Sequence, residues 1–190
     1  MINDLFGGMG MARNLVAVAL AATIATQVHA ATELAIGGGL PKLQGEYLSG
    51  RKATLPGDAS GRVSLLLFGF TYQSRFQVEP WGKRFRGEFE GNPKVTFYEI
   101  PMIGGMARMG KWFIDSGMRR GTPKTDQENV ITVYGGTDAW KAFVGFKAED
   151  AAYLVLLDAK GNIAWVYAGP LHEAEFQVLA AKVRMLVSNQ

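Results

Sequence analysis

Residues 151–169 read AAYLVLLDAKGNIAWVYAG, and this stretch decides the fold class. Residues 152–157 and 163–167 are two apolar runs of strand length. The residues between them, 158–162 (DAKGN), include the aspartate, glycine and asparagine that favour a tight turn. The stretch therefore predicts a β-hairpin, and the chain then continues into a predicted closing helix over residues 172–187.

Upstream of the hairpin, segments with strand and helix patterns alternate. Apolar runs and β-branched residues predict strands over residues 63–70 (VSLLLFGF), 94–100 (KVTFYEI) and 130–134 (VITVY). Apolar side chains at three- and four-residue spacing, with a capping residue before the last of them, predict helices over residues 74–89, 102–113 and 137–143. Residues 37–62 are rich in glycine, proline and polar residues, which predicts loops and a short hairpin. This order predicts an α/β fold with a central mixed β-sheet flanked by helices.

The overall composition excludes several classes of protein. The chain has 190 residues, of which 48% are hydrophobic and 19% charged, as in an ordinary globular domain. The net charge of +3 is too small to predict the concentrated basic face that nucleic acid requires, so we expect no nucleic-acid partner. The chain contains no cysteine, which excludes cysteine nucleophiles, iron–sulfur clusters and zinc–thiolate sites.

The N-terminus has the pattern of an export signal. Residues 15–24 (LVAVALAATI) are apolar or small, and an arginine precedes them. Val28 and Ala30 supply the small residues of a cleavage site. We therefore expect a signal peptide over residues 1–30, cleavage after Ala30, and a single periplasmic or secreted domain over residues 31–190. The alternative is an uncleaved anchor, although the apolar run is short for a membrane span.

The predicted order of elements resembles the thioredoxin fold. The hairpin stretch LLLDAKGNIAWVYAG is similar to one that is widespread among thioredoxin-like proteins. Residues 68–72 (FGFTY) resemble the strand end of Sco-type copper chaperones, where it leads into a Cys-x-x-x-Cys motif. The positions that match those two cysteines are Gln73 and Gln77. The resemblance therefore implies a thioredoxin-like domain in which amides replace both thiols.

The same resemblance implies that the rest of the redox site is lost. Ser74 stands where the peroxidase form of the fold has its cysteine, three residues after Thr71. We expect Ser74 to cap a helix, because the only histidine after the predicted signal is His172 and a serine nucleophile needs a base. Redox-active members have a cis-proline at the place of Ala152. We therefore expect no catalytic residue, with Gln73, Ser74, Gln77 and Ala152 as degenerate redox or metal positions.

A second resemblance covers more of the chain. Residues 131–179 are similar to the C-terminal half of the mitochondrial ATP synthase assembly factor ten family, and residues 117–120 (GMRR) also resemble it. That family is thioredoxin-like and lacks the redox pair. The resemblance implies a non-catalytic assembly or chaperone factor that has a membrane protein complex as partner and needs no cofactor. The alternatives are a degenerate peroxiredoxin-like enzyme that uses Ser74 and a Sco-like metallochaperone with altered ligands.

Residues 102–124 combine basic, aromatic and methionine side chains. Met102, Met106 and Met109 recur at helical spacing, which fits a core-filling stripe better than a copper-binding thioether site. We therefore expect no metal. Five basic residues and one acidic residue, Asp115, occupy the later part of the segment. One interpretation is a core helix followed by a solvated loop. The other is a surface that flanks the vacated redox site and binds a partner helix or a membrane. The candidate binding residues are Met106, Met109, Trp112, Arg119 and Arg120.

Overall fold

The computed structural model describes residues 34–190, apart from the side chains of residues 106–108. The predicted signal peptide and its cleavage site after Ala30 lie outside this part of the chain. Within residues 34–190, no helix has both the length and the apolar character that crossing a bilayer requires. Every strand, both hydrophobic cores and all the helices described below belong to this one compact unit.

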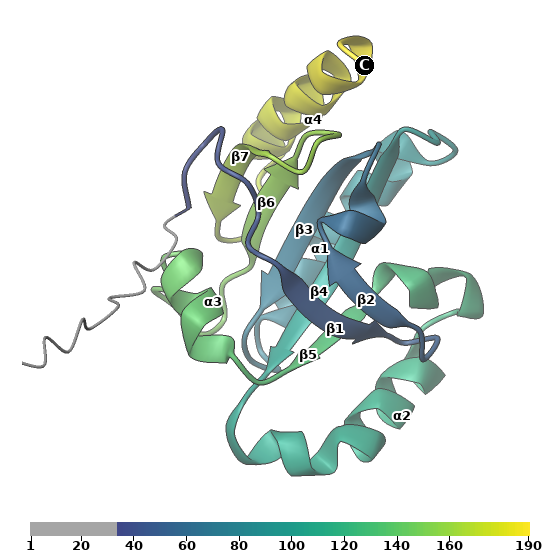
Figure 1. Ribbon diagram of the computed structural model, residues 1–190, viewed down its shortest axis with the longest axis vertical. Helices are drawn as coiled ribbons and strands as arrows, with labels where there is room; N and C mark the ends of the chain where they lie inside the picture. Colours follow the sequence, from purple (N-terminus) through teal and green to yellow (C-terminus); the bar gives the residue numbers. More distant parts are fainter. Residues whose placement is uncertain (1–33) are drawn as a thin grey trace, which may run out of the picture. The chain divides into compact units, whose positions relative to one another are not determined.

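The centre of the molecule is a mixed sheet of seven strands (Figure 1). The strands are β1 (Leu43–Tyr47), β2 (Lys52–Leu55), β3 (Val63–Gly69), β4 (Val95–Ile103), β5 (Ile131–Tyr134), β6 (Tyr153–Leu157) and β7 (Ile163–Ala168). Their order across the sheet is β2-β1-β5-β4-β3-β6-β7. Strand β3 pairs in parallel with β4 and antiparallel with β6, so Leu66 lies between Tyr98 and Val155. All seven residues of β3 are buried, which explains why this strand is apolar without alternation.

Helices cover both faces of the sheet. They are α1 (Arg75–Phe89), α2 (Lys111–Gly121), α3 (Thr137–Phe143) and α4 (Glu173–Ser188), with short 3-10 helices η1 (Gly57–Ala59), η2 (Gly105–Gly110) and η3 (Lys124–Asn129). Trp81 of α1 and Phe176 of α4 are fully buried against the same face, together with Leu154 of β6. Phe143 of α3 packs in the core of the opposite face. The predicted two-sided α/β architecture is therefore confirmed.

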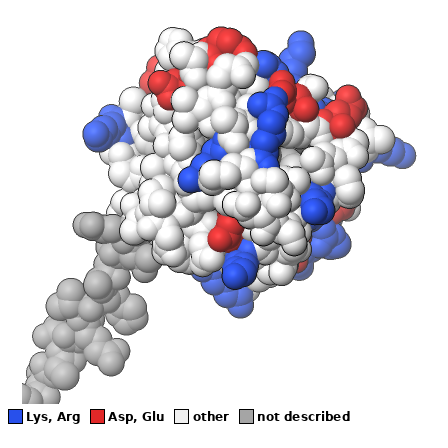
Figure 2. All heavy atoms as spheres, turned by 90° about the horizontal axis from the view of Figure 1, so that it is seen from above, with Lys and Arg blue, Asp and Glu red and all other residues white. Residues whose placement is uncertain are grey.

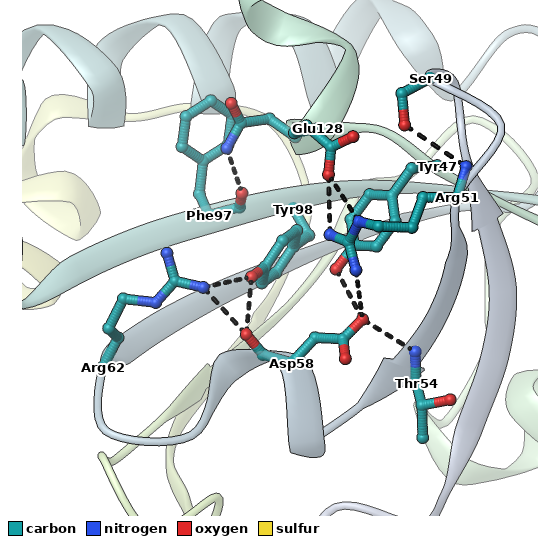
Figure 3. Close-up of polar contacts among 10 residues, drawn as sticks. Tyr47, Ser49, Arg51, Thr54, Asp58, Arg62, Phe97, Tyr98 and Glu128 are labelled. Carbon is teal, nitrogen blue, oxygen red and sulfur yellow. Dashed lines mark hydrogen bonds and ion pairs between the residues drawn. The ribbon is translucent and has the colours of Figure 1, made fainter.

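A polar network fixes the N-terminal hairpin β1–β2 to the rest of the fold (Figure 3). Asp58 of η1 accepts hydrogen bonds from the Tyr47 hydroxyl at 3.0 Å and the Thr54 N–H at 3.1 Å. Arg51 lies between Asp58 and Glu128 of η3, with 2.7 Å to the latter. Burial of the phenol raises the pKa of Tyr47 above its ordinary value. The short hairpin that was predicted within residues 37–62 is therefore present and anchored at several points.

The predicted helix over residues 102–113 is wrong in its first half. Strand β4 continues to Ile103, because Met102 pairs with Val133 of β5. Met102 is consequently a buried strand residue and does not belong to a helical methionine stripe. The chain then forms η2 and enters α2 only at Lys111. Glycine explains this late start, since three glycines lie within residues 104–110 and each lowers helix stability.

Candidate functional site

Ser74 lies where the chain turns from β3 into α1. It is 1% exposed, and its hydroxyl donates to the Thr71 carbonyl at 2.7 Å. The Ser74 N–H donates in return to the Thr71 hydroxyl at 3.3 Å. A Cβ on Gly69 would lie 2.5 Å from the Ser74 hydroxyl oxygen, so only glycine leaves room for this turn. Ser74 is held as a structural residue, and His172 is at the far N-terminus of α4.

The structure brings two of the four degenerate positions together. The Gln77 side-chain oxygen accepts a hydrogen bond from the Ala152 N–H at 3.3 Å. The Ala152 carbonyl accepts the Gly169 N–H at 2.9 Å, and Ala152 is fully buried. Gln73, in contrast, is exposed in the loop before α1. The amide at the second position and the Gly169 N–H thus satisfy both main-chain polar groups of Ala152.

A cavity of about 540 Å³ opens beside Gln77 and Ala151. Its walls come from the loop after α3 and from strand β7, and they are mostly apolar, with Lys147 and Asp150 among the polar residues. The Tyr153 hydroxyl holds one wall in place by accepting the N–H groups of residues 147 and 148 at 2.7 and 2.9 Å. This volume is in the range of small-molecule sites. None of the described side chains of residues 102–124 lines this cavity, so the cavity does not extend to the candidate binding segment.

The candidate binding segment has its large apolar side chains in solvent. Met109 is 84% exposed, Trp112 72% and Phe113 76%. The two aromatic rings contact each other edge to face, with centroids 5.2 Å apart. The core-helix interpretation of these three residues is therefore wrong. The side chain of Met106, also a candidate, lies outside the described part of the chain.

The two candidate arginines differ in their surroundings. Arg119 turns towards the β1–β2 hairpin, where its Nε donates to the Leu48 carbonyl at 2.5 Å and its guanidinium lies 3.9 Å from Glu46. Arg119 therefore holds α2 on the hairpin and has a structural contact that the sequence did not indicate. Arg120 is exposed. Of the two, Arg120 is the one that presents its charge to solvent.

Glu99 is a titratable residue that the sequence reasoning missed. It lies on β4 and faces α1, where its carboxylate oxygen is so close to Gly82 that a Cβ there would lie 2.3 Å away. It also borders a cavity of about 190 Å³, with Glu79, Arg86 and Asp126 in the walls. Burial, and then the charge of Glu79, raise the pKa of Glu99 from 4.5 to about 7. The available signal was a glutamate, the one charged residue inside a strand that is otherwise mostly aromatic or apolar.

No arrangement of three acidic, histidine or cysteine side chains in residues 34–190 is placed to hold a metal ion. The features of the described residues that could serve a function are therefore an apolar cavity, the partly buried carboxyl of Glu99 and an exposed aromatic surface.

Comparison with known proteins identifies the fold. No protein-family model matches the chain, and a search of curated proteins finds no significant match. Among solved structures, the thioredoxin domain of a thiol-disulfide oxidoreductase from Bacteroides vulgatus is similar with a TM-score of 0.55 and 18% identity, over 80% of this chain and 99% of that one. A peroxiredoxin-like protein from Aquifex aeolicus has a TM-score of 0.53 and 18% identity, over 81% and 88%.

A third structure, the exposed lipoprotein thioredoxin of Streptococcus pneumoniae, has a TM-score of 0.51 and 12% identity, over 75% of this chain and 99% of that one. At such low identities the similarity establishes the fold and leaves activity open. Together with the mixed sheet and its flanking helices, it shows that this cysteine-free chain has a thioredoxin-like fold.

Proposed function

We propose that this protein is an exported, non-catalytic assembly or chaperone factor that binds subunits of a membrane respiratory complex such as the ATP synthase. One observation carries the proposal. The fold is similar to that of thiol-disulfide oxidoreductases, yet the chain has no cysteine with which to exchange a disulfide. At one of the degenerate positions, the side-chain oxygen of Gln77 instead accepts a hydrogen bond from the Ala152 N–H. Since a fold does not by itself dictate an activity, we take a thioredoxin-like domain without redox cysteines to be a binding scaffold.

The surface supports a role in binding. Large apolar side chains at 72–84% exposure are unfavourable in water unless a partner covers them, and aromatic residues are the usual anchors of protein interfaces. The alternative of a serine-based peroxidase has less support. The Ser74 hydroxyl is engaged by Thr71 within the turn, and no base contacts it in the described residues.

The choice of ATP synthase as the client rests on the sequence resemblance alone. Residues 131–179 carry it, with the GMRR stretch at residues 117–120. In the structure the first of these segments runs from β5 through the hairpin β6–β7 into α4. The second lies in α2, next to the exposed aromatic pair. The resemblance therefore includes a segment of the proposed binding surface.

Capture of the client tests the proposal. The full chain, with a C-terminal affinity tag, is expressed in its own host, and detergent-solubilised membranes are passed over it. We expect subunits of the ATP synthase to be enriched, and fewer assembled complexes on native gels when the gene is deleted. A Val178→Ala, Met185→Ala variant, which removes exposed apolar side chains from α4, is the control and should retain the client. Normal levels of assembled complex in the deletion strain, with no subunit enriched, would disprove the assembly role.

A further inference from the structure

Helix α2 is docked on the fold by its polar side chains. Asp115 is only 4% exposed, and it accepts a hydrogen bond from the Tyr134 hydroxyl at 2.6 Å. Lys111, one turn earlier, contacts both Asp115 and Glu46 of β1. Burial works against the charge of Lys111, but its hydrogen bonds with Asp115 and Glu46, together with the negative charges of both carboxylates, raise the pKa of the lysine. The inner face of α2 thus consists of the buried Asp115, its partly exposed partner Lys111, and the half-buried Ile114 and Met118.

The outer face of α2 is apolar. Arg120 lies two helical turns after the adjacent residues Trp112 and Phe113. All three side chains therefore lie on one side of the helix. All three are exposed, and so is Met109 just before the helix. We call Met109, Trp112, Phe113 and Arg120 the outer patch. The usual amphipathic order is reversed here, because the carboxylate is inside and the large apolar side chains are outside.

The charge of the outer patch is positive. The acidic residue of α2, Asp115, is buried and paired, so it does not reach this surface. Arg120 of the outer patch and Lys124, which begins η3 three residues after the end of α2, are exposed, and neither has an ion pair with any residue of the described part of the chain. The opposite end of the molecule, seen from above in Figure 2, shows basic and acidic side chains interspersed. Helix α2 lies at the lower end in Figure 1.

We infer that the outer patch docks on the surface of an anionic lipid bilayer. Tryptophan and phenylalanine insert at the boundary between headgroups and acyl chains, and basic side chains beside them pair with lipid phosphates. A complementary protein surface would require acidic groups arranged around a specific aromatic pocket, whereas a bilayer fits any exposed apolar patch with a basic rim. This inference concerns the same exposed side chains that support the proposed function, but it assigns them to a lipid surface and not to the client protein, so it does not require the assembly role.

Vesicle binding measures the docking directly. The chain is used both in full and as residues 31–190, which contain the complete sheet and both cores, so that the apolar residues 15–24 do not dominate the result. The probes are vesicles of phosphatidylcholine alone and of phosphatidylcholine with phosphatidylglycerol in equal parts. We expect residues 31–190 to co-sediment with the anionic vesicles, to be released by salt, and to show a blue shift of Trp112 fluorescence that is lost in Trp112→Phe.

Two double variants separate the contribution of the aromatic side chains to vesicle binding from that of the basic side chains. Trp112→Ala with Phe113→Ala should lower the partition coefficient by on the order of tenfold or more, since both rings lose their place in the interface. Arg120→Gln with Lys124→Gln should lower it by roughly twentyfold or less, because one basic side chain near an anionic surface contributes roughly fivefold. The matched controls are Val178→Ala with Met185→Ala, and Lys83→Gln with Lys160→Gln, which remove exposed apolar groups and charges elsewhere. Both controls should bind as the parent does.

Three results would overturn the inference. One is failure of residues 31–190 to bind anionic vesicles, even if the chain captures a client protein, since the patch would then be a protein interface. Another is full vesicle binding by the Trp112→Ala, Phe113→Ala variant. The last is equal loss in the control variants, which would indicate non-specific adsorption. The circular dichroism spectrum and the urea midpoint of each variant show that it is folded. Loss of client capture with vesicle binding intact would count against the proposed function and leave the membrane docking supported.

Discussion

At the scale of single residues, Glu99 couples the stability of the protein to pH. Its carboxyl is partly buried beside Gly82 and shares a cavity with Glu79, Arg86 and Asp126, but forms no ion pair within the described residues. Arg86 is itself paired with Asp126 at 2.5 Å. The folded state therefore favours the protonated acid, with a pKa of about 7 against an ordinary value of 4.5. Because the folded protein binds this proton more tightly than the unfolded chain, the free energy of unfolding falls as the pH rises between those two values.

Glu99→Gln should remove this dependence. Glutamine resembles the protonated acid, so between about pH 5 and about pH 8 the parent should lose roughly 2 kcal/mol of stability relative to the variant. Urea unfolding at several pH values measures the difference, and Glu90→Gln, at an exposed position outside this cluster, is the control. Parallel pH profiles for the parent and Glu99→Gln would show that the carboxyl ionises as freely in the fold as in water.

At the scale of elements, replacing glycine by alanine should change the free energy of unfolding in opposite directions at two positions. A Cβ on Gly45 of β1 would lie 2.6 Å from Ile131 and 2.8 Å from the Thr132 carbonyl, both on the neighbouring strand β5. Gly45→Ala should therefore destabilise the protein by roughly 2 kcal/mol, since main-chain atoms cannot move aside. Gly87 of α1 has open space around its Cβ position, so Gly87→Ala should stabilise by about 0.5–1 kcal/mol. Thermal unfolding compares the two, and an unchanged midpoint for Gly45→Ala would mean that β1 packs more loosely than described.

The elements that the sequence predicted well are those whose pattern is local. Strand β3, helix α3 and the hairpin β6–β7 lie within a residue or two of their predicted bounds, because an unbroken apolar run or a turn of fixed composition specifies each one. The start of α2 was mispredicted because methionine spacing imitates a helix while Met102 belongs to β4. The Gln77–Ala152 hydrogen bond joins residues 75 positions apart. No local pattern indicates such a contact, and only the resemblance to thioredoxin-like proteins brought both residues into the same site.

At the scale of the whole molecule, the described elements lie between Leu43 and Ser188, and the sequence predicts that residues 1–30 are removed on export. The export pattern ends at Ala30. We expect the protein isolated from its native host to begin at Ala31, since the cleavage site is followed by a short segment before the first strand. Intact-mass spectrometry of the periplasmic or secreted fraction checks this directly. Finding residues 12–30 still attached to a cytoplasmic protein would contradict it, and finding them attached in the membrane fraction would show an anchor.

The segment just after the expected cleavage site has a consequence for solubility. The N–H of Gly37 and the carbonyl of Gly38 both pair with Ile163, at 2.7 Å each, so this segment caps the beginning of the outermost strand β7. At the other margin of the sheet, β2 has only four residues and carries Lys52. Open strand margins are templates on which further chains can stack and aggregate. The predicted cleavage after Ala30 would keep Gly37 and Gly38 in the mature chain, and with them the cap that keeps the first residue of β7 from pairing with another chain.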